Sequence, residues 1–514
     1  MNNANLLPMR MRRIDDPELS ENRGSSEEGI AIEPITISRR AWFTLALLSS
    51  TLLTVFFSET MLLPAIPEII QDFNITYGTA AWIFSAYLII AAVMTPVAGR
   101  LSDLYGKKKV LLVLLTIYIV GLVTGGFADN ISVLLVTRII QGVGLAAVPA
   151  AFSLLRDTFP PAKLAIAVGV FGSAYSAGSV VGLLVGASII QNFGWHSTFL
   201  AIIPFSALVT IMIAKFVKED KKMHRTSSVE AKDNSSKRRR ASFPIDIKGV
   251  SALSVTITSF LIALTLIQIG VSSQNIVQIA SAFVVSGISL SIFVILEKRI
   301  VPPFLDLRLL RHPILLPSFI LLIAAGITMF MIYPTIVQLV RSPIPLGFGG
   351  DSVDAANVQL PFMITFLVFA SITPLIINRI GSIKPMIIGG AISLVGALGL
   401  TLFHSTEFAL STSLAIVASG LSLTMTATWN MVVSSSPKEF TGISVGVGAL
   451  LLFIGMAIGP ALAGVYMENH ETIEGVRGSY PSTGSYEQIF LTAALLSAVT
   501  VGFALQLRRR VHKP

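Results

Sequence analysis

Long apolar runs alternate with short polar turns along the chain from residue 41 onward. A helix needs ~20 mostly apolar residues to cross a bilayer, and fourteen runs meet this requirement. The pattern predicts an all-α integral membrane protein with fourteen transmembrane helices. The runs cover residues 41–66, 79–101, 109–127, 131–154, 164–190, 197–217, 249–270, 275–296, 314–340, 358–378, 383–403, 408–431, 441–467 and 487–507.

Polar segments divide these runs into groups. The tail 1–40 contains Ser, Glu, Arg and Pro without hydrophobic periodicity, which is typical of disorder, and its length excludes a cleaved signal peptide at the first run. We expect two six-helix bundles with two additional helices between them. The predicted division is a cytoplasmic tail (1–40), an N-terminal bundle (41–217), a basic cytoplasmic loop (218–248), two additional membrane helices (249–296), a cytoplasmic linker (297–313), a C-terminal bundle (314–507) and a cytoplasmic tail (508–514).

The fifth and thirteenth runs carry the same small residues at the same spacing. Residues 168–170 and 445–447 both read Val-Gly-Val, and the positions that follow match at the same constant offset along the chain. Small residues at every fourth position let helix backbones approach closely. A shared offset favours two duplicated bundles, which is an architecture typical of transporters. The matched pairs are Gly178 with Gly455, Gly182 with Gly459, and Gly186 with Ala463.

The composition excludes several classes of protein. Only 13% of residues are charged, against roughly 25% in soluble chains. The chain has no Cys, which excludes disulfides, thiolate metal sites and Cys nucleophiles. It has no G-x-x-x-x-G-K-[ST] nucleotide loop, and its six His show no metal-ligand spacing. We therefore expect neither an enzyme nor a cofactor or metal site.

The net charge of +9 indicates orientation. In a soluble protein it would suggest a nucleic-acid partner. Here all Lys and Arg except Arg138, Arg341 and Arg477 fall on the side that holds both termini. Cytoplasmic loops carry such an excess, so we expect cytoplasmic termini, a multi-pass protein of the plasma membrane and no nucleic acid.

Two motifs resemble those of a known family. Residues 99–109 read Gly-Arg-Leu-Ser-Asp-Leu-Tyr-Gly-Lys-Lys-Lys, similar to the G-x-L-x-D-x-x-G-[RK]-[RK]-[RK] loop of the major facilitator superfamily. Residues 138–144 read Arg-Ile-Ile-Gln-Gly-Val-Gly, similar to its R-x-x-Q-G-x-G motif. With fourteen spans, the chain resembles the drug:proton antiporter branch. The resemblance implies export of hydrophobic or cationic compounds in exchange for protons. Its expected partners are a small-molecule substrate, protons and the lipid bilayer, and we expect a monomer.

The chain departs from that family at two places. The antiporter motif of the fifth helix, G-x-x-x-G-P-x-x-G-G, contains Gly178, Gly182 and Gly186, but Leu183 and Ala187 replace its proline and last glycine. In the first helix Ser58 stands where relatives often carry Asp, and the acid follows as Glu59. Moving an acid by one residue along a helix rotates its side chain by ~100° around the helix axis. Glu59 therefore points in a different direction from the Asp of those relatives.

Glu59 and Arg138 are the ionisable residues that fall inside the predicted spans away from their ends. A charge at the bilayer centre costs ~2.5–3.5 kcal/mol on insertion scales, and such residues are usually functional. Glu59 precedes Pro67 by ~12 Å of helix and Arg138 follows Ile131 by ~10 Å, at 1.5 Å per residue. We expect both at a similar depth, coupling proton and substrate together with Gln141. The alternative is a static ion pair between two helices.

Further residues are candidates for a conformational latch and a substrate pocket. The resemblance implies a latch at the cytoplasmic end of the second helix, formed by Gly99, Arg100, Asp103, Gly106 and Lys107. Drug pockets are mostly apolar with few polar groups. Anchoring at the membrane interface is the alternative role for Trp and Tyr. The pocket candidates are Tyr87, Tyr333, Gln338, Gln359, Trp429 and Asn430.

Proton-coupled efflux by alternating access is thus the predicted function. A transporter of the same superfamily for a nutrient, siderophore or lipid remains open. A channel is less consistent with duplicated bundles, and a receptor or scaffold gives no reason for two charges inside the membrane.

Overall fold

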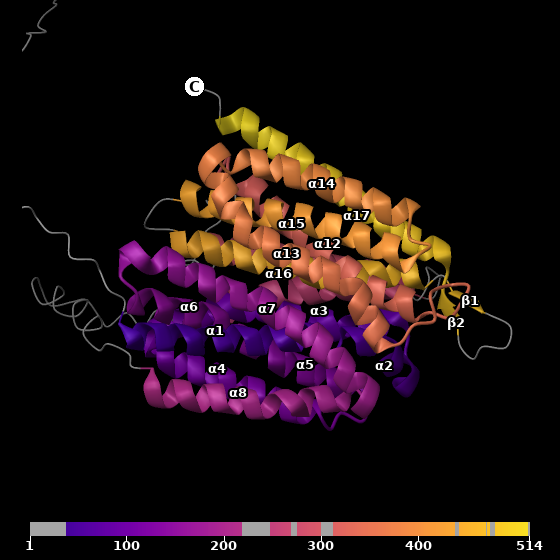
Figure 1. The fold of residues 1–514 in the computed structure, drawn as a ribbon, viewed down its shortest axis with the longest axis horizontal. Helices are drawn as coiled ribbons and strands as arrows, with labels where there is room; N and C mark the ends of the chain where they lie inside the picture. The colour runs from indigo at the N-terminus through magenta and orange to yellow at the C-terminus, as the bar shows by residue number, and fades with distance from the viewer. Residues whose placement is uncertain are drawn as a thin grey trace, which may run out of the picture.

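A computed structural model describes residues 38–217, 247–268, 275–299, 312–436, 441–468, 470–472 and 479–511. Within them, fourteen helical segments are long and apolar enough to cross a membrane, so the predicted all-helical membrane fold with fourteen spans is confirmed. The helices lie side by side (Figure 1). We call the end where α1 begins and α17 ends the terminus side, and the opposite end the far side. Most of the predicted tail 1–40, loop 218–248 and linker 297–313 lies outside the described residues.

The chain forms two groups of helices with a pair of helices between them in sequence. The N-terminal half contains α1 (Arg39–Thr60), η1 (Leu63–Ala65), α2 (Ile66–Phe73), α3 (Tyr77–Tyr105), α4 (Lys107–Gly125), α5 (Ile131–Leu145), α6 (Ala147–Thr158), α7 (Pro161–Phe193) and α8 (His196–Phe216). The pair is α10 (Ile247–Gln268) and α11 (Ile276–Arg299). The C-terminal half contains α12 (Leu315–Arg341), α13 (Ser352–Ile380), α14 (Ile383–Leu402), α15 (Glu407–Ser435), α16 (Thr441–Met467) and α17 (Thr483–Val511).

A short antiparallel strand pair is an element that the hydropathy pattern did not predict. Strands β1 (His470–Thr472) and β2 (Ser479–Pro481) pair His470 with Pro481 in the connection between α16 and α17. They lie on the far side (Figure 1). Three-residue strands have no room for a hydrophobic alternation, so the sequence carries no clear signal for them.

Prolines break two of the spans into consecutive helices. The first span runs from α1 through η1 to α2, and Pro64 and Pro67 stand where the helix is interrupted. The fourth span passes from α5 to α6, with Pro149 in the first turn of α6. Proline has no backbone N–H to donate and its ring clashes with the preceding turn. The α1 break leaves Glu59 close to a helix end in the middle of a span.

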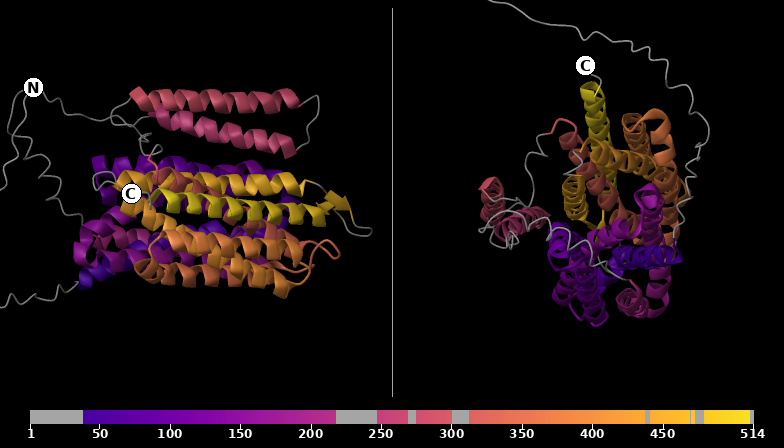
Figure 2. Two further views of the ribbon diagram at one scale, coloured as in Figure 1. Left: turned by 90° about the horizontal axis from the view of Figure 1, so that it is seen from above. Right: turned by 90° about the vertical axis from the view of Figure 1, so that its left-hand side faces the viewer.

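The two halves meet along two seams, where α3 packs against α16 and α7 packs against α13. The α10–α11 pair lies beside the halves on one flank (Figure 2). Helix α10 packs against α3 and α16 together, and Trp82 of α3 donates its indole N–H to Thr265 of α10 at 2.8 Å. The pair therefore covers one seam of the molecule.

Matched glycines set the packing inside each half. A Cβ at Gly182 of α7 would lie 2.5 Å from the Phe57 carbonyl oxygen of α1, and one at Gly459 of α16 would lie 2.7 Å from the Ile327 carbonyl oxygen of α12. The helix pairs thus approach in the same way at equivalent positions of the two halves. This agreement supports the duplication inferred from the sequence.

Replacing Gly182 with Ala should destabilise the protein, by about 1–3 kcal/mol for overpacking against backbone atoms that cannot move aside. Thermal unfolding in detergent, followed by tryptophan fluorescence, measures the effect. Gly169→Ala on the same helix is the matched control, because no atom lies within 4 Å of a Cβ at that position. The control should unfold at the same or a higher temperature. Equal losses for both variants would contradict the packing argument.

Candidate functional site

Glu59 is an acidic side chain buried between the halves. It is the penultimate residue of α1, and only 2% of its surface is exposed. Neither carboxylate oxygen has a hydrogen-bond partner among the described residues. A buried charge without a partner is costly, so the site favours any group that brings a proton or a positive charge to this carboxylate.

Arg138 of α5 is fully buried beside it, held by backbone and amide oxygens. Its Nε donates to the Ile83 carbonyl at 3.2 Å, and its Nη1 donates to the Ser58 carbonyl at 3.2 Å. The same Nη1 donates to Oε1 of Gln141 at 2.8 Å. Gln141 in turn donates Nε2 to the Gly121 carbonyl at 3.3 Å. The guanidinium is therefore fixed, while its Nη2 has no partner among the described residues.

Glu59 and Arg138 do not form an ion pair in this structure. Neither carboxylate oxygen of Glu59 is bonded, although Arg138 attracts the carboxylate over a longer distance. The guanidinium also lies 5.1 Å from the Tyr87 ring centroid, a cation–π distance. The structure thus brings Glu59, Arg138, Gln141 and Tyr87 together but leaves the acid free, which differs from the static pair considered as the alternative.

The one-residue shift of the acid changes what it faces. Ser58 hydrogen-bonds with Tyr118 of α4, and its carbonyl accepts from Arg138. The charge of Glu59 is felt by Tyr87 of α3, Tyr175 of α7 and Tyr333 of α12, which come from both halves. Successive helix residues differ by about 100°, so the carboxylate points toward the meeting place of the two halves. Sequence reasoning missed Tyr175, because nothing in the run indicates that this side chain faces α1.

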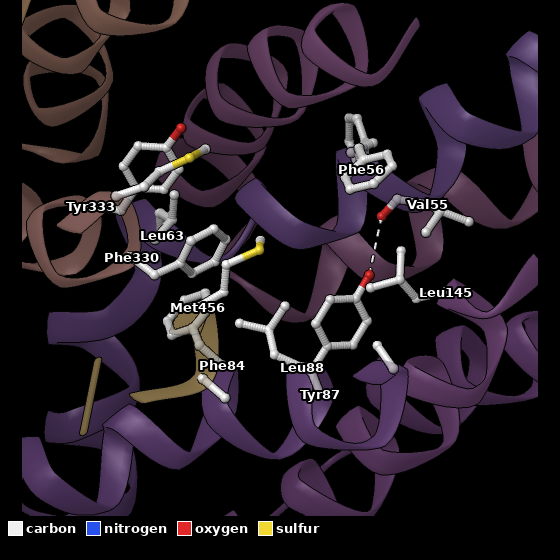
Figure 3. Close-up of a cluster of buried hydrophobic side chains, with 14 of the residues drawn as sticks. Val55, Phe56, Leu63, Phe84, Tyr87, Leu88, Leu145, Phe330, Tyr333 and Met456 are labelled. Carbon is white, nitrogen blue, oxygen red and sulfur yellow. Dashed lines mark hydrogen bonds between the residues drawn. The ribbon is translucent and has the colours of Figure 1, made fainter. Parts of the chain in front are cut away.

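Buried apolar side chains from both halves form a cluster (Figure 3). Phe84 and Tyr87 of α3 lie near Phe330 and Tyr333 of α12, and Met456 of α16 joins them. The Tyr87 hydroxyl donates to the Val55 carbonyl at 3.4 Å. This cluster is mostly apolar with few polar groups, as in pockets that bind hydrophobic ligands.

The other predicted pocket residues lie at different positions between the terminus side and the far side. Gln359 of α13 is 1% exposed, and both of its amide atoms lack partners among the described residues. The Tyr333 hydroxyl lies 3.5 Å from the Met363 sulfur. Trp429 of α15 packs toward Gly448 of α16. Asn430 is exposed and accepts a hydrogen bond from Ser382 near the terminus side.

The predicted latch is described only in part. The side chains of Arg100 and Asp103 lie outside the described part of the chain. Gly106 has φ of 98° at the junction of α3 and α4, a conformation that only glycine adopts readily. Lys107 pairs with Asp157 at the end of α6, at 2.5 Å, within the same half. A Cβ added at Gly99 would meet no described atom within 4 Å.

Polar bonds join the halves on the far side, and we call this set the far-side seal. Arg341 at the end of α12 donates to the Pro64 carbonyl at 2.6 Å and to Oε1 of Glu68 at 2.9 Å. Gln338, a predicted pocket residue, donates to the Tyr77 hydroxyl at 2.8 Å. The remaining members are Gln191, which donates to Asp351 at 2.6 Å, and Gly78, whose N–H donates to Glu468 at 3.3 Å.

The terminus side differs from the far side. Between described side chains, no hydrogen bond or ion pair joins the two halves there. A cavity of about 370 Å³ on the far side is lined by members of the seal, including Glu68, Arg341 and Asp351. Within the described part of the chain, polar bonds therefore fasten the halves at the far side, and the Ser85 hydroxyl of α3 adds one bond to the Ala457 carbonyl of α16 at 2.7 Å, farther along the same seam.

Comparisons with known proteins agree with this architecture. The chain is 25% identical over 456 residues to a tetracenomycin C resistance and export protein of Streptomyces glaucescens, covering 87% of this chain and 80% of the relative. It is 25% identical over 435 residues to multidrug resistance protein 3 of Bacillus subtilis (strain 168), covering 82% and 80%. The crystal structure of the human organic anion transporter MFSD10 (TETRAN) matches with a TM-score of 0.60 at 15% identity, over 90% of this chain and 99% of that one.

The family model matches most of the chain. The model described as Major Facilitator Superfamily aligns with residues 48–460, which include both motif segments at 99–109 and 138–144. The resemblance stated from those motifs is confirmed. The chain belongs to the Major Facilitator Superfamily of membrane transporters.

Proposed function

We propose that this protein is a proton-coupled exporter of hydrophobic or cationic drug-like compounds that works by alternating access. The observation that carries the proposal is Glu59, a buried carboxylate without a partner among the described residues, at the meeting place of the halves. Such a group binds either a proton or a positively charged substrate. The names of its relatives, for tetracenomycin C export and multidrug resistance, support the substrate class.

The proposal includes an orientation in the plasma membrane. The basic residues favour a cytoplasmic terminus side, which makes the far side extracellular. With the far-side seal closed, the described conformation faces the cytoplasm, ready to accept substrate. The six-two-six division supports this cycle, because two rigid halves that rock about a central site alternate its exposure. We propose that the monomer carries the complete site.

Glu59 couples proton entry to substrate export, because the proton and the substrate compete for its carboxylate. A cationic substrate that approaches from the cytoplasm displaces the proton from the carboxylate, and a proton from outside later displaces the substrate. Arg138 holds the end of α1 by donating to the Ser58 carbonyl, and Gln141 accepts a second bond from the same guanidinium nitrogen. The end of α1 and Arg138 therefore move together within the N-terminal half, and the surroundings of the carboxylate change when the C-terminal half moves relative to it.

Efflux from everted membrane vesicles tests the proposed function. Vesicles that contain the protein should accumulate tetraphenylphosphonium when their interior is acidified, and a protonophore should stop the accumulation. Vesicles without the protein are the control. Uptake that persists unchanged after the proton gradient collapses would contradict proton coupling. Uptake of a panel of neutral nutrients in place of cations would favour the alternative of another small-molecule substrate.

A further inference from the structure

Gln359 of α13 is the one buried side-chain amide, among the described residues, of which both polar atoms lack a hydrogen-bond partner. Only 1% of its surface is exposed. Gln338 differs, because its Nε2 donates to the Tyr77 hydroxyl and belongs to the far-side seal. A polar group that leaves water without gaining a hydrogen bond destabilises the fold. Packing alone therefore does not explain why an amide stands at position 359.

The amide lies on the face of α13 that is turned away from the membrane. Ile364 and Val368 are 47% and 44% exposed, and they mark the membrane-facing side of the helix. Phe362 and Met363 follow Gln359 by three and four residues, which places all three on one face. All three side chains are buried, so this face points into the protein.

The same face of α13 meets Tyr333 of α12. The rings of Phe362 and Tyr333 lie perpendicular to each other with centroids 5.2 Å apart, and the Tyr333 hydroxyl lies 3.5 Å from the Met363 sulfur. Tyr333 is also within electrostatic reach of Glu59. One side chain therefore links the face that carries Gln359 to the carboxylate.

The segment that follows Glu59 touches the C-terminal half directly. The short helix η1 begins four residues after Glu59 and packs against both α12 and α13. Its first residue, Leu63, lies beside Tyr333 and Phe330 (Figure 3). The carboxylate of the N-terminal half and the amide of the C-terminal half therefore belong to the two sides of one interface.

Glu59 and Gln359 also lie at a similar depth. The far-side cavity is lined by Glu68 of α2 and Ser352 of α13, which mark a common level in the two halves. Glu59 precedes Glu68 by about 13 Å of helix and Gln359 follows Ser352 by about 10 Å, at 1.5 Å per residue. The charge and the amide are thus nearly level with each other across the interface.

We propose that Gln359 is a specificity-determining residue, which binds a hydrogen-bonding group of the substrate while Glu59 binds its positive charge. A side-chain amide offers one acceptor and two donors, so hydroxyl, carbonyl and amide groups all fit it. The preferred substrates are then apolar organic cations that carry such a group and contact both halves at once. This inference rests on the proposed function and adds the substrate feature that the C-terminal half recognises.

Two phosphonium cations that differ by one amide group test the inference. Tetraphenylphosphonium has no hydrogen-bonding group, whereas (4-carbamoylphenyl)triphenylphosphonium carries one on the same apolar frame. The measurement is the ratio of their Kd values, from displacement of tritiated tetraphenylphosphonium bound to the purified full-length protein. Gln359→Met keeps the length of the side chain and removes both polar atoms. It should weaken binding of the carbamoyl cation, relative to tetraphenylphosphonium, by about tenfold, the scale of one or two net hydrogen bonds.

Gln488→Met is the matched control. Gln488 is exposed on α17, so the same chemical change there should leave the Kd ratio as it is in the unsubstituted protein. An unchanged ratio in Gln359→Met would overturn the inference and leave the proposed function intact. Absence of binding of either cation to the unsubstituted protein would overturn the proposed substrate class and this inference with it.

Thermal unfolding without ligand separates recognition from a structural role of Gln359. Gln359→Met should unfold at the same or a higher temperature than the unsubstituted protein, because it loses only a buried amide that has no partner among the described residues. A marked drop in that temperature would show that the amide stabilises the fold, which would contradict the inference.

Discussion

Replacing Glu59 with Gln is expected to lower proton-driven efflux by about 10²-fold or more, the scale on which a positioned proton-transferring group contributes. Gln has nearly the same shape as Glu but takes up no proton and carries no charge. The variant should also fold normally, because neither oxygen of Glu59 has a hydrogen-bond partner among the described residues. The efflux rate is measured as tetraphenylphosphonium uptake into everted vesicles with an acidic interior.

Glu407→Gln is the matched control for this experiment. Glu407 is exposed in the first turn of α15, so the same chemical change there should leave efflux unaltered. A direct binding assay adds a second readout, in which Glu59→Gln should weaken tetraphenylphosphonium binding and remove its dependence on pH. Full pH-driven efflux by Glu59→Gln would exclude the carboxylate as the coupling group.

Replacing Arg341 with Gln is expected to open the far-side seal. Arg341 donates to the Pro64 carbonyl and to Glu68 across the two halves. Hydrogen bonds to charged groups contribute about 1.5–3 kcal/mol, and about 1.4 kcal/mol is tenfold in an equilibrium. The population open to the far side should therefore rise about tenfold or more. In an Ala80→Cys background, where the side chain is 2% exposed, a membrane-impermeant maleimide added from the far side measures that population.

Two further variants sharpen this experiment. Arg379→Gln removes an exposed arginine at the terminus end of α13 and should not change the labelling rate. Glu68→Gln should raise the labelling rate. The double variant with Arg341→Gln should destabilise the sealed state by less than the sum of the two single effects, because the two side chains share one interaction. Unchanged labelling in Arg341→Gln would show that this arginine does not hold the halves together.

The sequence predicts the spans well because each depends on local composition. A run of apolar residues long enough for the bilayer indicates a helix wherever its partners lie, and even the breaks at Pro64 and Pro149 have a local cause. The site is different. Glu59 and Arg138 stand out as charges inside apolar runs, but whether they pair depends on the rotation of α1, which hydropathy does not record.

Contacts between the halves are the part that sequence reasoning could not provide. Gln338 resembles a pocket residue by its place inside an apolar run, and in the structure it belongs to the far-side seal through Tyr77. Arg341 and Glu68 lie in opposite halves of the chain, and no local pattern links them. Tyr175 was missed for the same reason, since its importance comes from facing α1.

The duplication of the fold has a consequence for how the transporter is powered. Phe57 of α1 and Ile327 of α12 face the matched glycines, and aligning these two residues places Met329 at the position of Glu59. Met329 is buried and binds no proton, so the second half lacks an equivalent of the carboxylate. If one carboxylate serves each cycle, one proton enters for each monovalent cation that leaves, and no net charge crosses the membrane. Export of such a cation would then follow the pH difference alone and be indifferent to the membrane voltage.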